Sequence, residues 1–169
     1  MRSRWAAGLF MICAAGWSSE TPSSMTGEQM KGYLEGAGMG LAKPAEMHSY
    51  PGPMHVLELA EGLGLTEEQR SAVEVVHRRM KERAMQLGRG VVDAERRLDR
   101  LFAGGEVSEA VLERTLAVIA GLQGDLRGVH LRAHIETRDL LTAEQVHEYD
   151  RLRGNAPSHP AEHHPGHGE

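Results

Sequence analysis

The sequence predicts an all-α protein built around one long antiparallel helical hairpin. Aromatic residues make up only 4% of the 169 residues, which favours helices packed through aliphatic side chains. Two long segments carry apolar residues at alternating steps of three and four, the spacing of an amphipathic helix. The pentapeptide Leu-Thr-x-Glu-Gln also occurs twice, at residues 65–69 and 141–145. Each copy has the composition of a helix start.

Both copies of the pentapeptide contain a capping box. Thr66 and Thr142 are good N-cap residues, because the hydroxyl accepts a hydrogen bond from a free backbone N–H in the first turn. Gln69 and Gln145 follow three residues later and can bond back to the N–H of the cap residue. The motif residues are Leu65, Thr66, Gln69, Leu141, Thr142 and Gln145.

We expect four helices, at residues 54–64, 66–102, 108–140 and 142–154, in one domain over residues 54–154. Residues 103–106, Ala-Gly-Gly-Glu, separate the two long helices. A lone hairpin buries little apolar surface, because each long helix has only one partner. A homodimer, which would cover the remaining apolar face, is therefore expected.

The turn of the hairpin predicts which residues face each other. A turn centred at residues 104–105 pairs positions whose numbers sum to about 209. Gly88 then faces Gly121, and Gly90 lies near Ile119. A glycine inside a helix costs about 1 kcal/mol relative to alanine. These glycines therefore predict either a close approach of the two helices or a bend that curves the hairpin, unless they are incidental.

The regions outside the helical domain differ in composition. Residues 1–17 are typical of a signal peptide, with Arg2 and Arg4 before 13 apolar residues. This run is shorter than the roughly 20 residues of a membrane span, so we expect a cleaved export signal. An uncleaved inner-membrane anchor is the alternative. Residues 18–53 are rich in Gly, Met and Pro and are expected to be mostly irregular, with a turn or two of helix at most. Residues 155–169 have the composition of a disordered, His-rich tail.

Charge and motifs exclude some classes of function. The formal net charge of −5 argues against a general nucleic-acid binder. No nucleophile elbow, Gly-rich phosphate loop or His-Glu-x-x-His motif is present, so we predict no catalytic residue and no required cofactor. The only cysteine, Cys13, lies in the signal segment, so the mature chain would have no disulfide.

A group of histidines suggests a metal site in the hairpin. The predicted register places His77 opposite Arg132, between His130 and His134, which share a helix face at i, i+4. Met80 lies one turn from His77. Three imidazoles and a thioether at one level could hold Zn, Ni or Cu, and the alternative is three surface histidines beside the core. Further candidate ligands are Glu74 and Glu136 in the hairpin and, for weak binding, His159, His163, His164 and His167 in the tail.

The segment before the hairpin is also rich in soft ligands. Its histidines and methionines are His48, His55, Met25, Met30, Met39, Met47 and Met54. The methionines fit equally well as adaptable apolar contacts.

The two motif copies and the hairpin resemble the Spy/CpxP family of periplasmic proteins. The resemblance covers about residues 52–154 and rests on "LGLTEEQRSAVEVVHRRM" and "RDLLTAEQVHEYDRLRG". The chain is also similar to the related periplasmic heavy-metal sensor proteins, which share the helical scaffold and carry His, Met or Glu ligands. The resemblance implies a small all-helical protein that dimerises into a curved cradle.

Three functions are compatible with that resemblance. The first is an ATP-independent chaperone for unfolded envelope proteins, or an envelope-stress adaptor that binds a sensor kinase. The second is a periplasmic heavy-metal sensor or metal-sequestering protein. A helical adaptor for one specific partner, with neither activity, is the third. On the sequence alone the chaperone is preferred, because the motifs that indicate the scaffold are more specific than the pattern of ligands.

Overall fold

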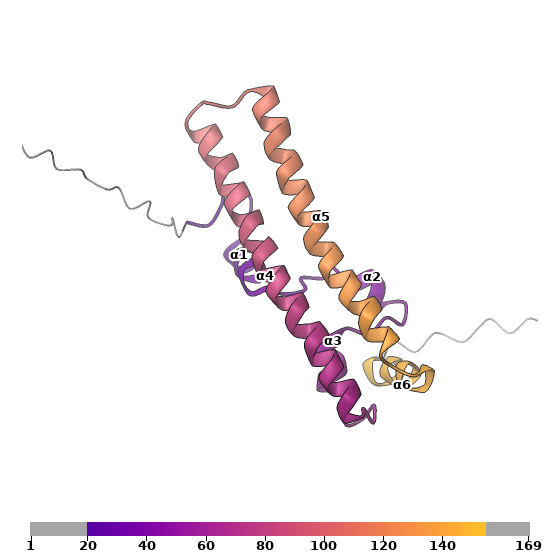
Figure 1. Cartoon of the computed structure of the whole chain (residues 1–169). Coiled ribbons are helices and arrows are strands. Elements are labelled where there is room, and N and C mark those ends of the chain that lie inside the picture. Colours follow the sequence, from indigo (N-terminus) through magenta and orange to yellow (C-terminus); the bar gives the residue numbers. More distant parts are fainter. Residues whose placement is uncertain (1–19, 155–169) are drawn as a thin grey trace, which may run out of the picture.

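The computed structural model describes residues 20–154 as a helical hairpin with short helices packed against it (Figure 1). The helices are α1 (Gly27–Glu35), α2 (Lys43–Glu46), α3 (Pro53–Glu58), α4 (Glu67–Ala103), α5 (Glu109–Asp139) and α6 (Ala143–Arg153). The two long helices, α4 and α5, lie side by side and antiparallel. The short helices α1 and α3 pack on α4, and α2 packs on α5. The predicted all-α hairpin is therefore confirmed for this part of the chain.

The expected signal peptide (residues 1–17) and the expected His-rich tail (residues 155–169) lie outside the described residues. Within residues 20–154, no helix has both the length and the apolar character needed to cross a bilayer.

Both predicted capping boxes are present. The Thr66 hydroxyl accepts a hydrogen bond from the Gln69 backbone N–H at 3.2 Å, and the Gln69 side chain accepts from the Thr66 N–H at 3.1 Å. Thr142 and Gln145 repeat this arrangement at 3.2 and 2.9 Å. The starts of α4 and α6 are thus fixed by side chains that the sequence identifies.

The two boxes also bind each other. The Gln69 side-chain amide donates to the Gln145 Oε1 at 2.8 Å, and the Gln145 amide donates back to the Gln69 Oε1 at 3.0 Å. Gln69 donates as well to the carbonyl of Leu140, and Gln145 to that of Leu63. The repeated pentapeptide therefore joins the start of α4 to the start of α6 at the base of the hairpin. The hydrophobic core next to this pair of glutamines consists of Val56, Leu63, Val73 and Tyr149.

A third capping box begins α1. Thr26 and Gln29 make the same pair of bonds, at 3.1 and 2.8 Å, within the sequence Met-Thr-Gly-Glu-Gln. Residues 18–53 were expected to contain a turn or two of helix at most, and α1, which is nine residues long, exceeds this. The many glycines led to that error, but Gly36 ends the helix in the left-handed conformation (φ 65°) and does not prevent it from forming.

The helix that precedes α4 is shorter than predicted. It was expected to reach residue 64, but α3 ends at Glu58, and turns continue to Gly64. Leu59 departs from helical geometry at φ −99° and ψ 12°. The turns place Leu63 in the hydrophobic core next to the glutamine pair.

Gly88 marks the closest approach of α1 to α4. A Cβ atom on Gly88 would lie 2.0 Å from the carbonyl oxygen of Tyr33. A Cβ atom on Gly121 would have no neighbouring atom within 4 Å. Gly121 therefore does not face Gly88, and this predicted pairing is wrong. Gly90 lies against Leu122, and Ile119 was expected there. The glycine at 88 therefore serves the packing of α1 on α4 and not the pairing of the long helices.

Replacing Gly88 tests this packing. Gly88→Ala should lower the free energy of unfolding by about 1–3 kcal/mol, because the new methyl group overlaps the Tyr33 carbonyl. Gly124→Ala is the matched control, since a Cβ there meets nothing within 4 Å. It should raise stability by about 0.5–1 kcal/mol. Urea denaturation followed by circular dichroism measures both changes, and equal effects at the two positions would contradict the close contact.

The glutamine pair is tested by a double-mutant cycle. Gln69→Ala and Gln145→Ala should show a coupling energy of about 0.5–3 kcal/mol, because each change leaves the other amide without its partner. Gln29→Ala removes only the local cap of α1 and should add independently to Gln145→Ala. Strict additivity of the first pair in chemical denaturation would rule out the bond between the motifs.

Candidate metal-binding pocket

A pocket of about 460 Å³ lies where the N-terminal arm (residues 20–58) meets the hairpin. One wall comes from the end of α1, the loop that follows it, the end of α2 and the start of α3. The other wall comes from α4 and α5. The lining residues are Glu35, Gly36, Ala37, Gly38, Met39, Gly40, Ala42, Glu46, Gly52, Pro53, Met54, His55, His77, Met80, Lys81, His130 and His134.

Four of the six hairpin residues predicted as candidate metal ligands line this pocket. His77 and Met80 come from α4, and His130 and His134 come from α5. The predicted register differs from the structure by three residues at Gly90. It still indicated one common level for these residues, because i, i+4 positions on one helix face one stretch of its partner. Met39, Met54 and His55 lie on the opposite wall, and the sequence did not predict that they would line the pocket. The segment that contains them is rich in Met and His, which indicated soft ligands. It has no periodicity from which their positions could be derived.

His134 is held in one orientation. Its Nδ1 lies 2.8 Å from the backbone oxygen of Tyr50, and a carbonyl can only accept, so Nδ1 carries the proton. In the neutral ring the free lone pair is then on Nε2. A Cβ atom on Gly52 would lie 3.1 Å from that Nε2 and 2.9 Å from Cε1. Histidines that bind metals usually donate their second nitrogen to a carbonyl or carboxylate in this way.

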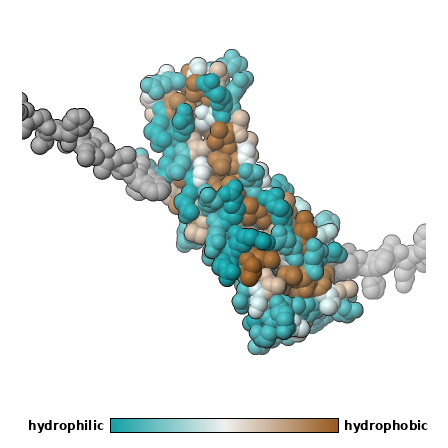
Figure 2. Space-filling view, in the orientation of Figure 1, coloured by the Kyte–Doolittle hydropathy of each residue, from teal (hydrophilic) through white to brown (hydrophobic). Residues whose placement is uncertain are grey.

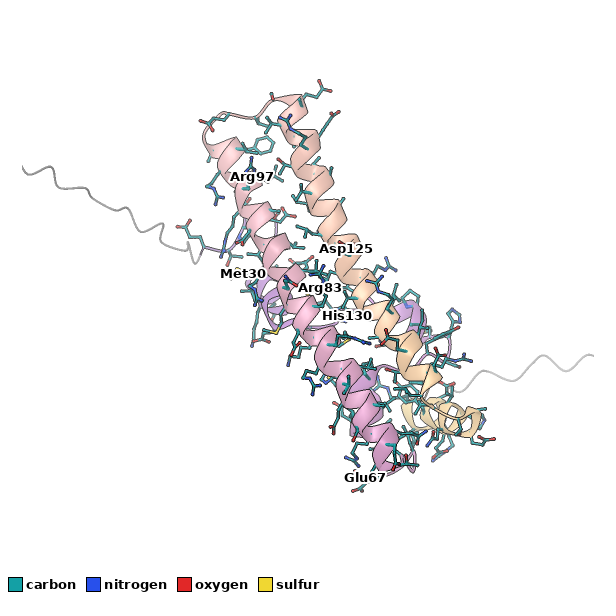
Figure 3. The ribbon with its side chains drawn as sticks, in the orientation of Figure 1. Met30, Glu67, Arg83, Arg97, Asp125 and His130 are labelled. Atoms are coloured by element: carbon teal, nitrogen blue, oxygen red, sulfur yellow. The ribbon has the colours of Figure 1, made fainter. Side chains whose placement is uncertain are left out.

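His130 has an unsatisfied nitrogen. The residue is only 3% exposed, and its Nε2 has no hydrogen-bond partner within residues 20–154. Burial lowers the pKa of His130, and the neighbouring His134 lowers it further. Figure 3 shows the labelled side chain between α4 and α5. A buried polar atom without a partner is costly. In the tautomer that leaves Nε2 unprotonated, this nitrogen can accept a ligand bond.

His77 and Met80 complete the α4 side. His77 is partly buried, and burial lowers its pKa, with a smaller contribution from the positive charge of Lys81. Met80 is partly buried and also lines a second groove on the other face of the hairpin. Its side chain therefore lies between the pocket and that groove.

A strap, defined here as residues 47–53, closes one side of the pocket. The Ser49 hydroxyl donates to Asp150 at 2.6 Å, and Arg138 donates to the Ser49 carbonyl at 3.0 Å. The Arg138 guanidinium also lies 4.7 Å from the centre of the Tyr50 ring. Ser49 has φ 60°, a conformation that non-glycine residues adopt only where surrounding contacts require it. The strap thereby fixes Gly52 against His134.

The imidazoles share the pocket without converging on one point. Within the described chain, no group of three or more His, Cys, Asp or Glu side chains is arranged to hold a metal ion. The extra ligands suggested by the sequence do not contribute: neither Glu74 nor Glu136 lines the pocket, and Glu136 pairs with Arg79. The tail candidates His159, His163, His164 and His167 lie outside the described residues. Any metal in this pocket must therefore use ligands other than a ready set of three imidazoles or carboxylates.

Comparison of the chain with protein-family models, with curated proteins and with solved structures gives no match. The likeness to Spy/CpxP proteins and heavy-metal sensors therefore stays a prediction based on the paired motifs.

Replacing Gly52 tests the fixed position of His134. Gly52 has φ −81°, so alanine is compatible with the backbone and only the imidazole obstructs it. Gly52→Ala should destabilise the protein by about 1–3 kcal/mol. In a His134→Ala background the same change should cost much less. Gly38→Ala, where a Cβ meets nothing within 4 Å, is the control. An equal cost of Gly52→Ala in both backgrounds, measured by urea denaturation, would exclude this contact.

Proposed function

We propose that this chain is a periplasmic metal-binding protein, either a sensor or a metal-sequestering protein, that holds its ion in the pocket between the arm and the hairpin. The observation that carries the proposal is the buried, unpartnered Nε2 of His130, in a pocket that also contains His77, His134 and Met80. The resemblance to periplasmic heavy-metal sensors points to the same function.

The electrostatics of the pocket support this proposal. Metal ions bind the neutral imidazole, so protons compete with them for histidine. Burial lowers the pKa of both His130 and His77, which favours the neutral ring that a metal ion needs. His134 receives its orientation from the Tyr50 carbonyl. Two of the three rings are thus prepared as ligands by burial, and the third by a hydrogen bond.

The placement of the pocket suggests how an ion would act on the fold. One wall belongs to the arm and the other to the hairpin, so a bound ion would hold the two together. A ligand that binds only the folded state stabilises it, by about 2.7 kcal/mol at a concentration 100 times its Kd. A sensor built in this way would report the ion through the position or order of the arm.

Metal titration of the full chain tests the proposal. The tail histidines are first replaced, in H159A, H163A, H164A and H167A together, so that weak binding there does not interfere. Calorimetric titration of this tail-substituted chain with Zn(II), Ni(II) and Cu should give one ion per chain. His77→Ala should weaken binding by about tenfold or more without unfolding the protein, since His77 is only partly buried.

His147→Ala is the control for this titration. His147 is exposed on α6 and does not line the pocket, so its replacement should leave the affinity unchanged. Loss of all metal binding once the tail is substituted would refute the proposed site.

The chaperone or stress adaptor remains a second candidate, because one face of the hairpin is uncovered. The short helices α1, α2 and α3 lie behind α4 and α5 in Figure 1. On the near face, Figure 2 shows hydrophobic residues along the groove between the long helices, with hydrophilic residues beside them. Part of this groove is lined by Val76, Arg79, Met80, Arg83, Val129, Arg132, Ala133 and Glu136. A surface of mixed apolar and basic character suits loose binding of unfolded chains, or a second copy of this protein in a homodimer.

The chaperone candidate is tested without metal or nucleotide. At stoichiometric excess, the protein should suppress aggregation of a chemically denatured client as measured by light scattering. Arg83→Glu reverses one charge at the groove and should reduce this effect. Arg114→Glu, at an exposed position of α5 outside the groove, should not. Unchanged client aggregation would contradict the chaperone function. The expected homodimer is tested separately by sedimentation equilibrium, in which a monomer would contradict it.

A further inference from the structure

We propose that the ion held in the pocket is copper(I), a soft monovalent cation, and that thioether sulfurs bind it together with imidazoles. The inference rests on the proposed function and names the class of metal. Three methionines from different parts of the chain line the pocket: Met39 in the loop after α1, Met54 at the start of α3, and Met80 in α4. Their presence on both walls is the observation that carries the inference.

The available donor atoms select against the harder divalent ions. Zinc is usually held by four ligands taken from Cys, His, Asp and Glu. The described residues contain no group of three or more such side chains around one point, and the only cysteine, Cys13, lies outside them. Thioethers are soft ligands and favour Cu(I). Imidazole also suits copper, so the two imidazoles on α5 together with methionine sulfur would make a ligand set for Cu(I).

Charge points in the same direction. Thioethers and neutral imidazoles carry no charge, so they cannot offset the loss of hydration of a divalent ion. Since the Born cost grows with the square of the charge, a divalent ion would lose roughly four times as much as a monovalent one. The charged residues that line the pocket are Glu35, Glu46 and Lys81. Two carboxylates and one ammonium leave a net charge of −1, which a single monovalent cation balances. A singly charged ion is the better match to this environment.

The backbone positions Met39 in an unusual way. Met39 has φ 43°, in the left-handed region that side chains rarely adopt. Its sulfur lies over α1, where a Cβ atom on Gly32 would be only 2.5 Å away. Strain of this kind persists only where the surrounding structure enforces it and is common at binding sites. Met39 and Met54 are 41% and 47% exposed, so both side chains can be reached from solvent, whereas His130 is buried.

Silver(I) and copper(I) titrations of the tail-substituted full chain test the inference. Silver(I) is a redox-stable analogue suited to calorimetry, and copper(I) is measured without oxygen by competition with a chromogenic chelator. Each should bind once per chain and at least about tenfold more tightly than Zn(II) or Ni(II). Met54→Leu and Met80→Leu keep the side-chain volume and should each weaken Ag(I) binding by about tenfold or more.

Met47→Leu is the matched control, because Met47 is 62% exposed in the same segment and does not line the pocket. It should leave Ag(I) affinity unchanged. If Zn(II) or Ni(II) binds more tightly and His77→Ala weakens that binding, the copper(I) assignment is overturned and the proposed function stands. Equal Ag(I) affinity in Met54→Leu, Met80→Leu and the parent chain would likewise overturn the thioether ligands. If none of the ions binds, both the inference and the proposed function are overturned.

Discussion

The hydrogen-bonded pair Gln69–Gln145 is the constraint on which the arrangement of the hairpin depends. Each amide caps its own helix and binds the other, so α4 and α6 begin at one level beside the end of α5. Because α5 leads directly into α6, the pair also limits how far α5 can slide along α4. A slide of one turn, about 5.4 Å, would separate His77 from the level of His130. The repeated pentapeptide thus fixes the register that brings the pocket residues together.

The strap (residues 47–53) connects the hairpin to the arm. Asp150 of α6 and Arg138 of α5 hold Ser49, and His134 holds the Tyr50 carbonyl. The Nδ1 of His134 thus makes a structural hydrogen bond, and the same ring lines the pocket. Any ligand that binds His134 acts on a ring that already fixes the arm. This shared residue gives the pocket a physical connection to the position of residues 47–53.

The sequence was a good guide wherever the signal was local or periodic. Apolar spacing predicted α4 and α5, the capping boxes predicted where α4 and α6 begin, and the i, i+4 pair His130 and His134 predicted one side of the pocket. Helix α1 was missed because its glycines outweighed the cap at Thr26, although that cap repeats the Thr-x-Glu-Gln pattern. The contacts of Gly88 with Tyr33 and of Gly52 with His134 depend on tertiary packing, which no local pattern encodes. Because the arm supplies a second wall to the pocket, metal binding is preferred here to the chaperone function that the sequence alone favoured.

The most direct test of the account is nitrogen NMR of the imidazole rings in the tail-substituted chain, before and after one equivalent of silver(I). Without metal, the account predicts that the proton of His134 is on Nδ1 and that Nε2 is unprotonated. With metal, the Nε2 signals of His130 and His134 should shift together, while that of His147, exposed on α6, should not move. Unchanged signals from His130 and His134 at one equivalent would contradict the central claim that this pocket binds a soft metal ion through these two imidazoles.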